Sequence, residues 1–243
     1  MNTPNRPALF ENRYDAGAKL AGKLAEYAGM SAVVLAIPNG GVPVAVPIAL
    51  ALGAELDIVV ARKLPIPLRP EGGFGAVVDD GTTIFNEAVL AALNLDEHQI
   101  NYQINKVRED IRRRSLAYRN NRALSLIKGK TAIIVDDGLA SGYTMLAAVE
   151  SVKRRQPSRV IVAVPAASEA AIQVVEKAAQ SVTTIETSRA PRFYIADYYR
   201  YWNNLSDEDG VRCFKDWRAR RRGYIAQQPT SPAPLPKIRK GLF

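Results

Sequence analysis

Short apolar runs alternate with segments of helical periodicity along most of this chain of 243 residues. The runs are rich in β-branched residues and too short for buried helices, so they predict strands covered on both faces. They occupy residues 31–38, 55–63, 132–135, 159–168 and 181–188. Strands that alternate with helices predict an α/β fold with an open, mainly parallel, twisted sheet flanked by helices.

The composition excludes several classes of protein. The chain has one cysteine, Cys213, and one histidine, His98, so it has neither an internal disulfide nor a Cys/His cluster for zinc. No apolar run approaches the roughly 18 residues that cross a bilayer, and residues 1–15 lack the apolar segment of a secretory signal. We therefore expect a cytoplasmic protein without a membrane partner, with one domain at 1–223 and a disordered, basic, Pro-rich tail at 224–243.

Positive charge is concentrated in clusters, and the formal net charge is +9. Arginines gather at 112–122 and again at 218–222. Such clusters bind an anionic partner, such as nucleic acid, or form a solvated helix face. The chain shows no RNP, KH or zinc-finger pattern beside them. The sequence therefore favours the solvated face and keeps nucleic acid as the alternative.

Prolines and glycines interrupt residues 64–85. This segment predicts a long flexible loop that ends in a β-hairpin, with Asp80 and Gly81 at its turn. Asn86 is a predicted N-cap, and residues 86–122 form a charged helical insertion. The apolar stripe of this insertion consists of Ile100, Ile104, Val107 and Ile111.

Two adjacent carboxylates, Asp136 and Asp137, directly follow the apolar run 132–135. In open α/β sheets, ligands bind at this carboxyl end of the strands. Small residues follow at 138–142 and a helix begins near Tyr143, so backbone N–H groups and the helix N-terminus can cradle a phosphate. Carboxylates accept hydrogen bonds from vicinal sugar hydroxyls. The acid pair and the cradle together predict a sugar-phosphate site.

The sequence IIVDDGLASGYTM, residues 133–145, resembles the signature with which type I phosphoribosyltransferases bind phosphoribosyl pyrophosphate (PRPP). Gly138 departs from it, because many relatives carry an apolar residue there. The resemblance extends over residues 10–205 and is greatest to a group of phosphoribosyltransferases without an assigned substrate. The PRPP-binding residues that it implies are Asp136, Asp137, Gly138, Leu139, Ala140, Ser141, Gly142, Tyr143 and Thr144.

The resemblance also implies the remaining parts of the fold. The core strands lie between residues 32 and 164, residues 64–85 become a flexible lid, and a small hood covers the site at 186–223. Asn39, Gly40 and Gly41 resemble the pyrophosphate loop, although a plain strand-to-helix turn is the alternative. Arg62 and Lys63 resemble the catalytic pair that opens the lid.

The implied reaction is displacement of pyrophosphate from PRPP by a base or base-like acceptor. Mg²⁺ is the implied cofactor, bound mainly through PRPP, with Asp136 and Asp137 as further candidate ligands. The lid excludes water. A homodimer is expected by analogy with the family.

The acceptor is not identified by the sequence. Ala140 stands where hypoxanthine-guanine enzymes have an aspartate, so the resemblance argues against that mechanism. The candidates for contact with the base are Phe193, Tyr194 and Tyr198 in the hood, because aromatic rings stack on bases. The alternative for all three is packing of the terminal segment onto the core.

Two other functions compete with the enzyme. A PRPP-sensing regulator that binds nucleic acid without catalysis would use the arginine clusters. A competence-type interaction module would carry an N-terminal cysteine cluster, which this sequence lacks. The tetrapeptide VDDG also occurs at 78–81, where no phosphate cradle follows it; we interpret this copy as a hairpin turn, with a role near Mg²⁺ as the alternative.

Overall fold

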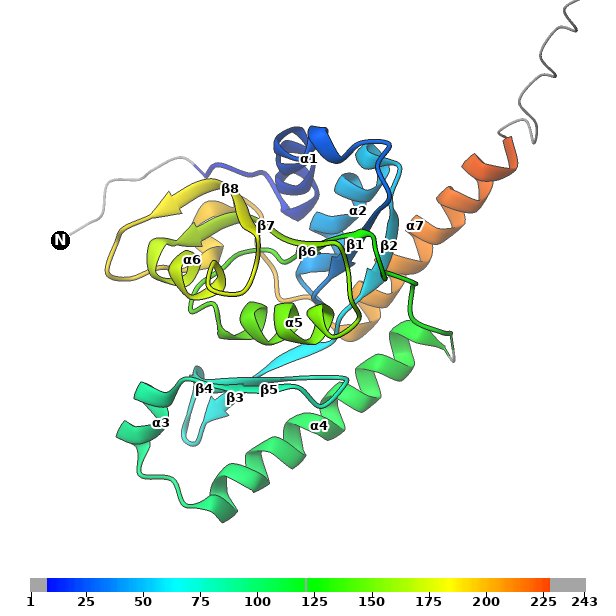
Figure 1. Cartoon of the computed structure of the whole chain (residues 1–243). Coiled ribbons are helices and arrows are strands. Elements are labelled where there is room, and N and C mark those ends of the chain that lie inside the picture. Colours follow the sequence, from blue (N-terminus) through cyan, green and yellow to red (C-terminus); the bar gives the residue numbers. More distant parts are fainter. Residues whose placement is uncertain (1–7, 121, 228–243) are drawn as a thin grey trace, which may run out of the picture.

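The main sheet is parallel throughout and contains five strands in the order β2-β1-β6-β7-β8. The structure is a computed structural model that describes residues 8–120 and 122–227. Figure 1 shows the sheet at the centre of the molecule. Its strands are β1 (Ala32–Ala36), β2 (Glu55–Ile58), β6 (Thr131–Val135), β7 (Arg159–Ser168) and β8 (Ser181–Ser188). The predicted α/β fold with an open parallel sheet is confirmed.

Helices cover both faces of this sheet because side chains alternate along each strand. Val34 and Ala36 pack toward one face, with α1 (Arg13–Lys23) and α2 (Gly41–Leu52). Val33 and Leu35 pack toward the other face. That face is covered by α5 (Tyr143–Lys153) and α6 (Glu169–Val175). Both faces of β1 and β6 are fully buried, as their continuous apolar runs predict.

A second, antiparallel sheet replaces the predicted flexible loop. It consists of β3 (Ala61–Ile66), β4 (Arg69–Val78) and β5 (Thr83–Phe85). The run 55–63, predicted as one strand, is therefore divided between two sheets. The division falls at Val59 and Val60: the Val59 N–H donates to the Ala36 carbonyl at 3.0 Å, and the Val60 carbonyl accepts from Asp79 N–H at 3.0 Å. The predicted hairpin turn between β4 and β5 is confirmed.

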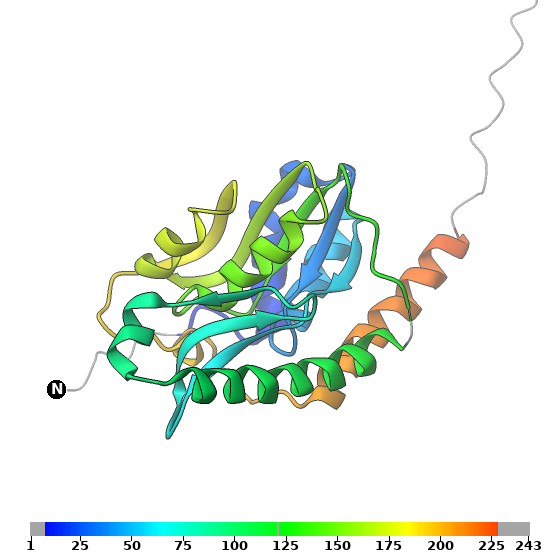
Figure 2. The same ribbon diagram turned by 60° about the horizontal axis from the view of Figure 1, so that its bottom comes forward.

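The small sheet lies between α5 and a long helix of the predicted insertion (Figure 2). After a short helix, α3 (Glu87–Leu93), this long helix α4 spans Glu97–Arg119. Asn86 caps α3, as predicted, by accepting the Val89 N–H at 3.3 Å. The α4 stripe is buried against the small sheet through Ile104, Val107 and Ile111.

The last helix departs from its predicted place in the hood. Residues 189–206, with the short 3₁₀ helix η2 (Ile195–Tyr198), cross the carboxyl edge of the main sheet. Helix α7 (Asp207–Gln227) then packs against α2 and α4 beside the sheet edge. Burial of apolar side chains holds α7 in this place, because Phe214 and Trp217 are each 4% exposed. Its last four residues fall within the predicted tail, of which residues 228–243 lie outside the described residues.

Over the residues that the structure describes, none of the helices combines the length and the apolar character that a membrane span requires.

Candidate active site

The segment after β6 forms one wall of a pocket of about 300 Å³. The opposite wall comes from β3 and β4, and Ile195 of η2 closes one side. The pocket is lined by Lys63, Glu71, Gly72, Gly73, Gly75, Asp136, Gly138, Leu139, Ala140, Ser141, Gly142, Tyr143, Thr144, Met145 and Ile195. The structure therefore brings the segment 136–145 together with Lys63 in one pocket.

Asp136 is the carboxylate that faces this pocket. Its Oδ1 atom accepts the backbone N–H of Asp137 at 2.8 Å. Burial and the neighbouring carboxylate of Asp137 raise the pKa of Asp136 well above its usual range. When the ionised form of a carboxyl group is disfavoured in the free protein, a ligand that supplies hydrogen-bond donors or positive charge stabilises that form strongly.

Asp137 is committed to a different partner and does not line the pocket. Its Oδ2 atom lies 2.8 Å from Nε of Arg13, and the side chains of Arg13 and Asp137 are only 8% and 13% exposed. The Arg13 guanidinium also stacks on the Trp202 ring at 3.7 Å, and the Tyr199 hydroxyl donates to the Asp137 carbonyl at 2.6 Å. Burial raises the pKa of Asp137, against the opposing effect of Arg13.

Sequence reasoning did not find Arg13. A signal was present, because Arg13 precedes Ala16 and Leu20 by three and seven positions on α1, and both are fully buried. A charged residue on the buried face of an amphipathic helix requires a partner.

The small-residue loop at 138–142 is held in place by the end of β7. The Leu139 N–H donates to the Ala166 carbonyl at 3.0 Å, and the Ser168 hydroxyl donates to the Ala140 carbonyl at 2.8 Å. Gly142 has a φ of +84°, and a Cβ atom there would lie 2.9 Å from the Ala171 carbonyl. Helix α5 begins at the next residue, so its first-turn N–H groups remain available at this pocket.

The loop after β1 packs directly against the acid pair. A Cβ atom on Gly40 would lie 2.0 Å from Asp137 Oδ2, and one on Gly41 would lie 2.6 Å from the Val135 carbonyl. The Asn39 side chain donates to the Leu205 carbonyl and to Asp207 Oδ1, each at 3.0 Å. Its oxygen accepts from Arg114 at 3.2 Å and from the Tyr118 hydroxyl at 3.0 Å. Asn39 thus fixes the loop, and only the glycines approach the acids.

Comparison with known proteins decides the family. A model described as the phosphoribosyl transferase domain matches residues 77–197. Two provisionally named phosphoribosyl transferases of Mycobacterium tuberculosis, from strains CDC 1551 and H37Rv, are each 36% identical over 203 residues. These residues cover 84% of this chain. The chain belongs to the type I phosphoribosyltransferase family.

Two further comparisons describe the extent of this similarity. The chain spans 46% of the length of each mycobacterial relative. It is also similar to the crystal structure of TT1426 from Thermus thermophilus, with 35% identity and a TM-score of 0.70. That match covers 86% of this chain and 98% of TT1426.

The pair Arg62-Lys63 divides between two faces of β3, because strand side chains alternate. Lys63 lines the pocket and donates to the Glu71 carbonyl at 2.6 Å. Burial lowers its pKa. Arg62 turns toward α4, where its Nε lies 3.2 Å from Asp110. Burial and then the nearby Arg114 lower the pKa of Arg62.

The three hood aromatics do not line the pocket. Phe193 and Tyr198 pack against each other with ring centroids 5.2 Å apart, and Tyr194 is 61% exposed. Ile195, which sequence reasoning missed, contacts the pocket instead, and its side chain would meet a Cβ atom on Gly138 at 2.7 Å. The unusual glycine at 138 therefore makes room for an aliphatic hood residue.

The other VDDG copy lies outside the pocket. Asp79 pairs with Arg119 at 2.9 Å, and burial raises its pKa despite that arginine. Asp80 Oδ1 accepts the Thr82 N–H at 2.9 Å. These acids shape the turn between β4 and β5, as the sequence predicts.

Proposed function

We propose that this protein transfers the phosphoribosyl group of PRPP to a nitrogen of a base or base-like acceptor and releases pyrophosphate. The observation that supports this activity is a single pocket that combines the Asp136 carboxylate, the cradle at 138–144 and the Lys63 ammonium. In the reaction the bond from ribose C1 to a pyrophosphate oxygen breaks, a carbon–nitrogen bond forms, and the acceptor loses a proton. The transition state resembles an oxocarbenium ion.

Each end of PRPP has a matching group. We assign the 5-phosphate to the cradle at 138–144, because backbone N–H groups and the α5 N-terminus attract phosphate. Asp136 accepts hydrogen bonds from the ribose hydroxyls. Asp137 positions Asp136, because its pairing with Arg13 fixes the segment that carries both acids. The pyrophosphate meets Lys63 and the backbone of Gly40 and Gly41. A lysine aimed at developing charge lowers the barrier of such a displacement.

Mg²⁺ fits this arrangement as a metal held mainly by its substrate. Among the described residues, no group of three or more His, Cys, Asp or Glu side chains could hold a metal ion alone. Mg²⁺ commonly binds one or two carboxylates together with substrate phosphates. Asp136 would be the protein ligand, with Asp137 as the second candidate beside it. When bound, the metal neutralises charge on the departing pyrophosphate.

The acceptor side of the pocket is apolar. Ala140 and Ile195 line it, and neither side chain can exchange a proton. Enzymes that act on 6-oxopurines carry an acid at the position of Ala140. Its absence supports a different acceptor. Proton removal from the acceptor then falls to solvent or to the departing pyrophosphate.

Pyrophosphate release tests the proposal. Purified protein with PRPP and Mg²⁺ is screened against nucleobases and small amines, and at least one acceptor should give sustained, acceptor-dependent release. Binding of PRPP without release from any acceptor, together with salt-dependent binding to RNA or DNA, would instead support the regulator. Light scattering at several concentrations tests the predicted homodimer.

A further inference from the structure

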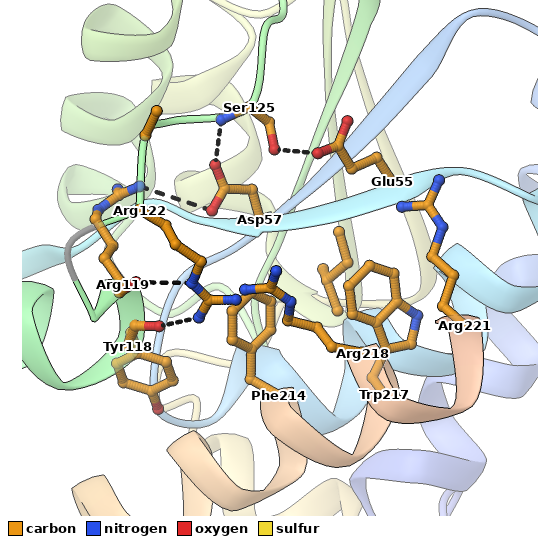
Figure 3. Close-up of a pocket in the computed structure, with 12 residues that line it drawn as sticks. Glu55, Asp57, Tyr118, Arg119, Arg122, Ser125, Phe214, Trp217, Arg218 and Arg221 are labelled. Atoms are coloured by element: carbon orange, nitrogen blue, oxygen red, sulfur yellow. Dashed lines mark hydrogen bonds and ion pairs between the residues drawn. The ribbon is translucent and has the colours of Figure 1, made fainter. Parts of the chain in front are cut away.

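A second pocket, of about 210 Å³, lies between the end of α4, strand β2 and helix α7 (Figure 3). It shares no lining residue with the candidate active site. Its walls are aromatic and basic. They consist of Glu55, Leu56, Asp57, Tyr118, Arg119, Arg122, Ala123, Ser125, Phe214, Trp217, Arg218 and Arg221.

Two guanidinium groups meet over one ring in this pocket. The Cζ atoms of Arg122 and Arg218 each lie 5.9 Å from the centroid of Phe214, and Figure 3 shows them side by side. Arg122 donates to the backbone carbonyls of residues 119 and 118, which carry no charge. Neither arginine pairs with a carboxylate among the described residues. Like charges this close repel, and an anion between them removes the repulsion.

The acidic side chains of the pocket are at its other end (Figure 3). Asp57 is already engaged by the protein, because it accepts the N–H groups of Ile58 and Ser125, each at 2.8 Å, and pairs with Arg119 at 3.6 Å. Glu55 accepts the Ser125 hydroxyl through Oε1 at 2.6 Å. Within the described part of the chain, the Oε2 atom of Glu55 accepts no hydrogen bond, so it can accept from a ligand hydroxyl.

From this arrangement we propose that the pocket binds a sugar monophosphate, either a free sugar phosphate or the 5′-phosphate end of a nucleotide. The phosphate lies between Arg122 and Arg218, and sugar hydroxyls donate to Glu55. Arg221, whose Cζ is 5.4 Å from the Trp217 centroid, adds further positive charge to the pocket. A phosphate monoester carries up to two charges and suits paired guanidinium groups, whereas a nucleic-acid diester carries one.

Trp217 provides a local reporter of this pocket. The chain has two tryptophans, so a Trp202→Phe background leaves Trp217 as the remaining indole. In this background, fluorescence is titrated with ribose 5-phosphate, AMP, inorganic phosphate and a short RNA. We expect a saturable change with ribose 5-phosphate or AMP, and the tighter of the two identifies the source of the sugar phosphate. Inorganic phosphate should bind about tenfold more weakly, because it cannot reach Glu55.

Arg218→Ala should raise the dissociation constant about tenfold or more. Arg220→Ala is the matched control, since Arg220 is an exposed arginine on the same helix that does not line the pocket; it should change the constant less than about twofold. Arg218→Gln serves as a second variant should Arg218→Ala fail to fold, as judged by circular dichroism.

The proposal would be overturned by no saturation up to about 10 mM ligand, by equal affinity of the Arg218→Ala and Arg220→Ala variants, or by a Trp217 response to RNA alone. Equal affinity for inorganic phosphate and ribose 5-phosphate would remove the sugar from the assignment and contradict it as well. The fluorescence titration requires no turnover, so its result is independent of whether pyrophosphate release is observed. Asp136→Asn should leave the Trp217 response unchanged.

Discussion

The Nε atom of Arg13 lies 2.8 Å from the Oδ2 atom of Asp137, although 124 residues separate them in the sequence. Trp202 covers the guanidinium, and the Asn203 carbonyl accepts from Nη1 at 3.0 Å. This pairing makes the two acids unequal. Asp137 is held by the protein, and Asp136 is left to face the pocket.

Arg13→Met should destabilise the protein by about 3–5 kcal/mol, because it leaves the Asp137 carboxylate buried without its partner. Urea unfolding followed by circular dichroism measures the change. Arg200→Met is the matched control: Arg200 pairs with Glu11 at 3.1 Å with both side chains more than half exposed, and its loss should cost less than about 1 kcal/mol. Equal effects of the two substitutions would contradict the structural role of Arg13.

Asp136→Asn should stabilise the ligand-free protein at neutral pH. The folded-state pKa of Asp136 is raised above its unfolded value, so the stability that this group contributes is present below the unfolded pKa and is lost as pH rises through the folded pKa. Asparagine does not ionise, so the variant does not lose this stability as pH rises. Thermal melts should show a higher Tm for the variant at about pH 7.5, with the difference disappearing near about pH 4. A variant less stable than the wild type at both pH values would argue against a disfavoured carboxylate.

Lys63→Met should lower the rate of pyrophosphate release about hundredfold, since it removes a positive charge from the pocket. Arg62→Met should lower the rate much less, because Arg62 faces Asp110 on α4 in this structure. The two adjacent substitutions remove the same charge from opposite faces of β3, so each controls for the other. Steady-state kinetics with the best acceptor gives the comparison, and a larger loss in Arg62→Met would show that Arg62 reaches the substrate.

Much of this site could be predicted because its information is local. The segment 131–145 specifies a buried strand, a small-residue loop and a helix start within consecutive positions, and the structure contains all three. The apolar stripe of α4 and the cap at Asn86 are likewise local patterns. The contacts that distinguish Asp136 from Asp137 are not local, since Arg13 and Tyr199 come from distant segments.

The division of 55–63 between two sheets could not be predicted for the same reason. Its apolar run is uninterrupted from Ile58 to Ala61, and what divides it is pairing to Ala36 on one side and Asp79 on the other. The small sheet was hidden by its glycines, which weaken strand propensity. Gly75 is required there, because a Cβ atom would lie 2.4 Å from the Ile84 carbonyl on the neighbouring strand.

Tyr118→Phe tests how the loop at 39–41, our proposed pyrophosphate loop, is supported. The Tyr118 hydroxyl donates to Asn39 at 3.0 Å, and Arg114 donates to the same oxygen at 3.2 Å. Loss of one of these two donors should cost about 1 kcal/mol of stability. It should also raise the KM for PRPP more than it changes kcat, because Asn39 positions the loop and does not face the acids. A Tyr102→Phe variant, in which an exposed tyrosine of the same helix is changed, should leave both parameters unaltered.

The most direct test of the account is calorimetric binding of PRPP and Mg²⁺ to three proteins: the wild type, Asp136→Asn and Asp80→Asn. The last variant changes the second aspartate of the other VDDG copy, which lies at the hairpin turn. The account predicts affinity about 10–100-fold weaker for Asp136→Asn, the loss expected for hydrogen bonds to a charged group, and unchanged affinity for Asp80→Asn. Equal affinity of all three proteins for PRPP would contradict the assignment of this pocket as the PRPP site.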